Sequence, residues 1–132
     1  TLAAFALGES ARPGGAVLDA LGRALGREKR IVPCASQLQA LGCLAARARV
    51  LGEEELRRRC LELILPFAWW PMHALVGEHA CLAVLQAAGP EGRLGEQAVA
   101  VMEHAVEHGA DSYMAHFASE ALRRHAAGCG AA

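Results

Sequence analysis

An internal repeat is the feature that most constrains how this chain can fold. The segments PCASQLQALGCLAARARVLG (33–52) and PMHALVGEHACLAVLQAAG (71–89) both begin with proline, carry Cys-Leu-Ala and end with glycine. They are offset by 38 residues, and a weaker third copy, MAHFASEALRRHAAG, covers 114–128. Self-similarity at such a period predicts that the chain folds as successive copies of one supersecondary unit.

The repeated unit is expected to be a pair of helices, because an amphipathic segment precedes each copy. These first helices are expected over 16–25, 54–67 and 94–108. In the middle one, apolar residues recur at the spacing of one helix face; they are Leu56, Cys60, Leu63, Ile64 and Phe67. In the last one, a helical wheel gives a buried arc; its residues are Leu94, Ala98, Val101, Met102, Ala105 and Val106.

The second helices of the pairs are expected over 36–50, 73–88 and 113–127. Ser36 is the candidate N-cap of the first of them, after a linker that ends at Pro33. The helix over 73–88 is apolar nearly all round. We therefore expect neighbouring helices to cover it on more than one side.

Composition favours an all-helical core. Apolar residues make up 54% of the 132 residues and aromatic residues only 5%, so the core is built mainly from Ala, Leu and Val. Ala and Leu are strong helix formers, whereas sheets favour β-branched and aromatic residues. A chain of this length forms one domain with its own core. We expect Leu63, Ile64 and Leu82 to be buried in it.

The period of about 40 residues resembles that of HEAT and armadillo arrays, in which helix pairs stack sideways. The resemblance covers 16–128 and implies an all-α fold of antiparallel helix pairs, stacked as a short right-handed α-solenoid. The implied units are 16–52, 53–89 and 93–128. A compact helical bundle is the alternative.

The first residues suggest the end of a helix that belongs to an earlier unit. LAAFAL (2–7) is apolar, and GESARPGG (8–15) then interrupts it with proline and glycine. In this interpretation, residues 1–132 are a single helical-repeat domain and one segment of a longer array. We expect the amino-terminal side to be covered by a preceding segment or a partner.

Net charge limits the class of partner. A formal charge of −1 gives no overall field that would attract nucleic acid or an anionic membrane. The arginines at 57–59 and 123–124 lie near acidic residues or helix ends, so we expect solvated faces there rather than nucleic-acid contacts. The charge-free run from Leu63 contains Pro66 and Pro71, which argues against a membrane span.

The five cysteines show no C-x-x-C spacing and are odd in number, so they predict neither a disulfide framework nor a zinc ribbon. Cys43 and Cys81 occupy equivalent positions of the repeat and are expected as small core residues. The lack of a disulfide framework favours a reducing compartment. We therefore expect an intracellular protein of the cytoplasm or an organelle matrix.

His104, Glu107 and His108 spell H-x-x-E-H, which resembles the motif of inverted zinc peptidases. Zinc chemistry needs a third protein ligand, which those enzymes take from a glutamate far downstream, and here only 24 residues follow His108. Both histidines fall at the border of the apolar arc, and Glu107 points away from it. We therefore interpret the motif as a solvated helix face, without catalytic, metal-binding or cofactor-binding residues.

Five residues are candidates for contact with a partner. Trp69 and Trp70 are adjacent in a turn, where we expect one buried ring and one partly exposed ring that anchors a partner. Glu78 and His79, with Gln86, are expected to form a polar stripe on the inner helix over 73–88. In a solenoid, inner helices line the concave surface, so this stripe favours contact over catalysis.

These observations predict a protein-binding helical-repeat scaffold or a structural subunit of a larger assembly, not an enzyme, with no cofactor. The alternative is a helical bundle that binds a metal or a small cofactor through its histidines. A third hypothesis is an RNA-binding helical repeat.

Overall fold

The computed structural model describes residues 15–71, 73–90, 92–109 and 112–130. Within these ranges the chain is all-helical, which confirms the predicted class, and it contains no strand. The helices are α2 (Gly15–Arg27), α3 (Ile31–Val50), α4 (Glu54–Trp69), α5 (Ala74–Ala88), α6 (Glu96–His108) and α7 (Ser112–Gly130). The helix expected from LAAFAL (2–7) lies outside the described residues.

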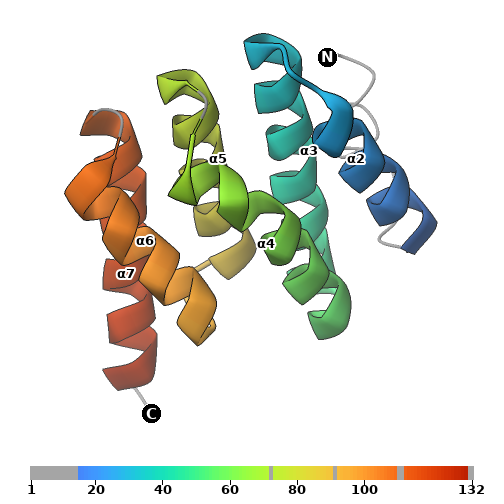
Figure 1. The fold of residues 1–132 in the computed structure, drawn as a ribbon. Coiled ribbons are helices and arrows are strands. Elements are labelled where there is room, and N and C mark those ends of the chain that lie inside the picture. Colours follow the sequence, from blue (N-terminus) through green and yellow to red (C-terminus); the bar gives the residue numbers. More distant parts are fainter. Residues whose placement is uncertain (1–14, 72, 91, 110–111, 131–132) are drawn as a thin grey trace.

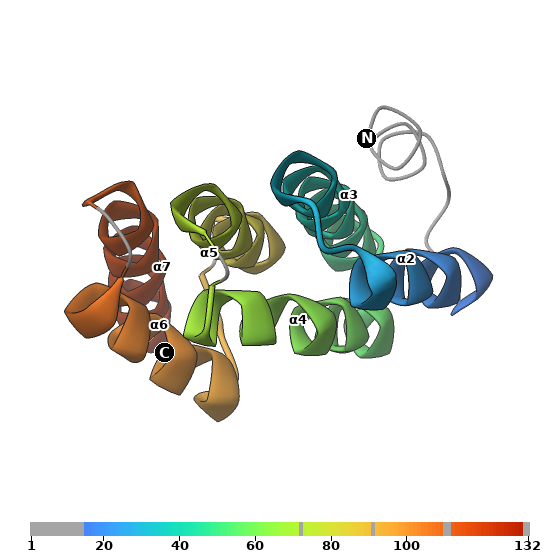
Figure 2. The same cartoon turned by 45° about the horizontal axis from the view of Figure 1, so that its top comes forward.

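The six helices form two layers (Figures 1 and 2). One layer consists of α3, α5 and α7 side by side, and the other consists of α2, α4 and α6. Helices that follow one another in the chain pack across the layers, while α3 packs on α5 and α5 packs on α7 within one layer. α3, α4, α6 and α7 all contact α5, so neighbouring helices cover this apolar helix on more than one side, as predicted.

The most extensive contact between two helices joins α3 to α5, and small residues form it. A Cβ atom built on Gly42 of α3 would lie 3.0 Å from both Cα and Cβ of Ala83 on α5. The same Cβ would lie 2.5 Å from Oε1 of Gln86. Ala45 and Ala80, one from each helix, are fully buried. The two helices approach this closely because Gly42 has no side chain.

The core extends through all three helix pairs. Its largest fully buried side chains include Leu18, Leu21, Leu38, Leu41, Leu44, Ile64, Val76, Val84, Met102 and Met114. The burial predicted for Ile64 is confirmed, whereas Leu63, also predicted to be buried, is only half-buried against the core. The prediction for Leu82 is wrong, because it is only half-buried and its neighbour Cys81 takes the inward position. A helix that is apolar nearly all round gives no periodicity from which its outward side can be identified.

The start of α3 differs from the prediction. Arg30 is the N-cap and the helix begins at Ile31, so Ser36 is not its cap. Pro33 lies in the first turn, where the backbone N–H groups have no partner within the helix, so a proline costs little there. The N–H of Cys34 makes the first helical bond, to the carbonyl oxygen of Arg30 at 3.1 Å.

Candidate functional site

Trp69 and Trp70 lie at the end of α4, and both are exposed, at 45% and 81% of their surface. The prediction that one of the two rings is buried is therefore wrong. Ala68 and Leu65 occupy the inward positions of this last turn, which leaves both indoles outside the core. The N–H of Trp70 donates to the carbonyl oxygen of Pro66 at 3.0 Å and closes the helix.

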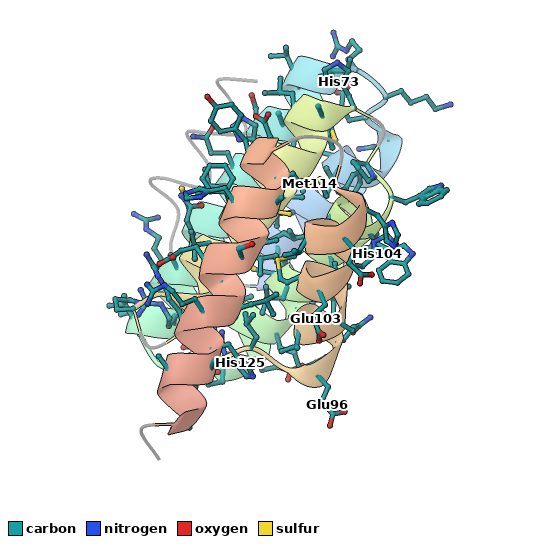
Figure 3. All side chains as sticks on the ribbon, turned by 90° about the vertical axis from the view of Figure 1, so that its left-hand side faces the viewer. His73, Glu96, Glu103, His104, Met114 and His125 are labelled. Atoms are coloured by element: carbon teal, nitrogen blue, oxygen red, sulfur yellow. The ribbon has the colours of Figure 1, made fainter. Side chains whose placement is uncertain are left out.

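Trp69 is held in place by α6. Its ring stacks on the imidazole of His104, with centroids 3.8 Å apart and planes inclined by 22°. The ring of His108 lies one turn further on, 4.9 Å from that of His104. Figure 3 shows His104 at the edge of α6 that faces away from α7. This stack could not be predicted from the sequence, because helix periodicity carries no information about contacts between separate helices.

The H-x-x-E-H residues divide into two groups. His108 and Glu107 are exposed, with His108 Nε2 at 3.5 Å from Glu107 Oε2, which confirms the predicted solvated face for these two. His104 differs, because it is half-buried beneath the indole and its buried Nδ1 has no hydrogen-bond partner in the part of the chain that the structure describes. In the described part of the chain, no three His, Cys, Asp or Glu side chains are placed to hold a metal ion.

A pocket of about 520 Å³ lies beside this stack. Its lining residues are Trp69, Ala100, Glu103, His104, Val106, Glu107 and Leu122. Val106 was expected in the core, but it is 40% exposed, because it lies about 40° beyond Met102 at the edge of the buried arc. The pocket thus combines apolar side chains with the exposed carboxylates of Glu103 and Glu107.

The other three candidates share a second surface. Glu78, His79 and Gln86 are half-buried on one outward arc of α5, together with Leu82. Burial lowers the pKa of His79, which favours the neutral imidazole. The arc belongs to α5, in the layer of α3, α5 and α7, whereas Trp69 ends α4, in the other layer, and stacks on α6 (Figure 2). The five candidates therefore lie on two separate surfaces.

The described cysteines are packing residues. Cys34, Cys60 and Cys81 are buried, and none of these or Cys43 is in a disulfide. Burial raises the pKa of Cys60 to about 12 and also raises that of Cys34, so neither supplies a reactive thiolate near neutral pH. Cys43 is only half-buried, contrary to the expectation of a core position.

By its fold, the described part of the chain is an all-α protein, and it has no helix that is both long and apolar enough to cross a bilayer. No family model, curated protein or solved structure matches the chain. The function of the aromatic stack and its pocket must therefore be inferred from their geometry and chemistry.

Proposed function

We propose that this chain is a helical-repeat scaffold of the α-solenoid kind that binds a partner protein and does not catalyse a reaction. The observation that carries the proposal is the pair of exposed indoles of Trp69 and Trp70 at the end of α4, of which Trp69 lines a partly apolar pocket. Tryptophan is among the residues most enriched at the energetic centres of protein interfaces.

The helix contacts support a stack of repeats over a compact bundle. All the substantial contacts join helices of the same pair or of adjacent pairs, such as α3 with α5 and α4 with α6. In a solenoid each unit contacts only its neighbours, whereas a closed bundle would bring the first and last pairs together. We extend the proposal to the right-handed stacking implied by the repeat, with three units formed by α2–α3, α4–α5 and α6–α7.

The pocket beside Trp69 suggests the chemistry of the partner. Trp69, Val106 and Leu122 offer apolar surface, while the carboxylates of Glu103 and Glu107 stand exposed at the same pocket. An apolar side chain of the partner would fill the pocket, and a neighbouring Lys or Arg would complement the two carboxylates. We therefore propose a partner segment with an apolar anchor next to basic residues.

Trp70 is the best single residue with which to test this proposal. A tryptophan buries about 150–250 Å² of surface, and Trp70 is 81% exposed, so its contact with a partner would remove most of that area from water. At about 25 cal/mol per Å² the upper estimate is about 3–5 kcal/mol, of which only part appears as affinity. We expect Trp70→Ala to weaken binding by about 30-fold or more.

The experiment is affinity capture from native extract with the wild-type chain and three variants, followed by quantitative mass spectrometry. Trp70→Ala and the double variant Glu103→Gln/Glu107→Gln should lose a partner that the wild type retains. Tyr113→Ala is the matched control, because Tyr113 is another aromatic residue with 64% of its surface exposed. Identical sets of captured proteins from the wild type and Trp70→Ala would refute the proposed surface.

A further inference from the structure

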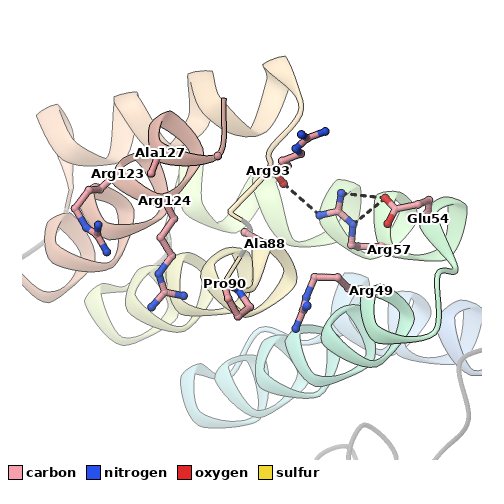
Figure 4. Close-up of a pocket in the computed structure, with 10 residues that line it drawn as sticks. Arg49, Glu54, Arg57, Ala88, Pro90, Arg93, Arg123, Arg124 and Ala127 are labelled. Carbon is pink, nitrogen blue, oxygen red and sulfur yellow. Dashed lines mark hydrogen bonds and ion pairs between the residues drawn. The ribbon is translucent and has the colours of Figure 1, made fainter. Parts of the chain in front are cut away.

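A second pocket, of about 880 Å³, lies where α3 and α5 end, and arginines dominate its lining (Figure 4). The charged lining residues are Arg49, Arg57, Arg93, Arg123, Arg124 and Glu54. The remaining lining residues are small or apolar; they are Ala88, Pro90, Ala127 and Gly128. We call this site the arginine pocket. Whether it binds a ligand depends on how many of its positive charges are already neutralised within the protein.

Arg57 is occupied by structural contacts. Its Nε and Nη2 donate to Oε2 of Glu54 at 3.2 and 3.1 Å. Its Nη1 donates to the carbonyl oxygens of Ala87 at 3.3 Å and Arg93 at 3.4 Å. Arg57 therefore connects the start of α4 to the end of α5 and has little donor capacity left for a ligand.

Arg123 and Arg124 share a single carboxylate. Arg123 donates from Nε to Oε2 of Glu120 at 2.9 Å, and Arg124 donates from Nε to Oε1 of the same residue at 3.1 Å. The bonds from Arg123 and then Arg124 lower the pKa of Glu120 to about 2, so it is ionised at neutral pH. One carboxylate compensates only one of the two guanidinium charges.

Arg49 and Arg93 have no ion pair with any described residue. The guanidinium of Arg49 lies against Gly89, where an added Cβ would be 2.3 Å from its Cζ and Nε. Gly89 has a φ of +66°, which favours glycine, and the absence of a side chain there makes room for Arg49. The Nε atom of Arg49 is buried and lacks a hydrogen-bond partner among the described residues.

The arginine pocket therefore carries an excess of positive charge. Five guanidinium groups face two carboxylates, those of Glu54 and Glu120, which leaves three positive charges among the described residues. The carboxyl ends of α3 and α5 each contribute the equivalent of about half a negative charge. This effect explains part of the arginine content, but about two of the positive charges remain uncompensated by the residues that the structure describes.

We propose that the arginine pocket binds a compact anion that bears phosphate groups. A guanidinium fork matches the geometry of phosphate oxygens, and a phosphomonoester carries about −1.5 to −2 charges at pH 7. Arg49 and Arg124 lie on either side of Pro90 (Figure 4), and both line the arginine pocket, so the ligand would enter between two guanidinium groups. The volume of about 880 Å³ lies within the range of about 300–1,000 Å³ that small-molecule sites occupy.

The observations favour such an anion over nucleic acid. None of the described residues that line the arginine pocket is aromatic, whereas proteins that bind single strands stack bases on aromatic rings. The chain as a whole carries a formal charge of −1, so the positive field is local and does not extend along a backbone track.

Isothermal titration calorimetry with inorganic pyrophosphate at low ionic strength tests the proposal on the full chain. We expect saturable binding at one site, weakened about a hundredfold in Arg49→Gln/Arg124→Gln, at about tenfold for each charged hydrogen-bond donor. The matched control, Arg23→Gln/Arg58→Gln, removes the same charge from exposed residues elsewhere and should bind like the wild type. Thermal unfolding of each variant verifies its fold.

A third variant, Arg124→Gln alone, removes one guanidinium group of the pocket and keeps Arg49, and it should weaken binding by about tenfold even if the double variant fails to fold. Titration with a phosphoserine peptide identifies the molecule that carries the phosphate. Tighter binding of the peptide would indicate a phosphorylated protein, and tighter binding of pyrophosphate would indicate a small molecule. The proposal is overturned if the wild type binds neither ligand, or if both double variants lose affinity equally. Preferential binding of single-stranded RNA would also overturn it.

Discussion

Replacement of Gly42 by alanine tests the close contact between α3 and α5. The new methyl group would lie 3.0 Å from Cα and Cβ of Ala83 and 2.5 Å from Oε1 of Gln86. The amide of Gln86 is the end of a flexible side chain and can turn away. The Cα of Ala83 is backbone, so α3 and α5 must move apart by a few tenths of an ångström along their whole contact.

Two opposing effects determine the size of the change. Alanine is better than glycine in a helix interior by about 1 kcal/mol, whereas an added methyl group in a well-packed core costs about 1–3 kcal/mol. The backbone contact with Ala83 leads us to expect the packing cost to dominate. We therefore expect Gly42→Ala to lower the free energy of unfolding by about 1 kcal/mol and Tm by about 3–5 °C.

Gly26→Ala is the matched control, because an added Cβ at Gly26 has no neighbouring atom within 4 Å. This change should raise the free energy of unfolding by up to about 1 kcal/mol, through helix propensity alone. Urea unfolding followed by circular dichroism compares the two variants. In a Gln86→Ala background the cost of Gly42→Ala should shrink but persist. Equal stabilisation by both glycine substitutions would refute the close approach of α3 and α5.

Three further predictions concern the core, the aromatic stack and pH. Ile64→Ala should cost about 2–5 kcal/mol of unfolding free energy and the half-buried Leu82→Ala clearly less; equal losses in urea titrations would contradict the assigned burial. His104→Ala should cost about 0.5–1.5 kcal/mol through the lost stack with Trp69, and an unchanged melting temperature would argue against this stack. The pKa of Glu120 is lowered from 4.5 to about 2, so its ionised carboxylate stabilises the fold above pH 4.5 and loses this effect as pH falls towards 2. Glu120→Gln should accordingly be less stable than the wild type at pH 6 and equal to it near pH 2, and a constant difference between the two would contradict this assignment.

Periodicity predicts the buried face of a helix only where polar residues mark its other faces. The spacing of Leu56, Cys60 and Ile64 identified the buried face of α4, because charged residues occupy most of the positions between them. The same reasoning failed for Leu82, because α5 is apolar on nearly every side. It failed for Val106 because the limit of a buried arc depends on how far the neighbouring helices reach.

The candidate site was only partly predictable. The adjacent indoles of Trp69 and Trp70 indicated an interface, since tryptophan rarely stays exposed without a reason. The helical wheel places His104 at the border of the apolar arc. It cannot predict the stack of His104 on Trp69, because Trp69 belongs to another helix pair. The arginine pocket was also missed, because Arg49, Arg93 and Arg124 come from separate helices and loops that meet only after the pairs pack.

The buried cysteines give this protein built-in reporters of local opening. A buried thiol, such as Cys60 with its pKa of about 12, reacts with an alkylating reagent only when its helix separates from its neighbours. Cys34, Cys60 and Cys81 are on α3, α4 and α5, so their labelling rates measure the opening of three adjacent helices without any introduced probe. A partner bound at Trp69 and Trp70 should slow the alkylation of Cys60, because both tryptophans lie at the end of α4, the helix that carries Cys60.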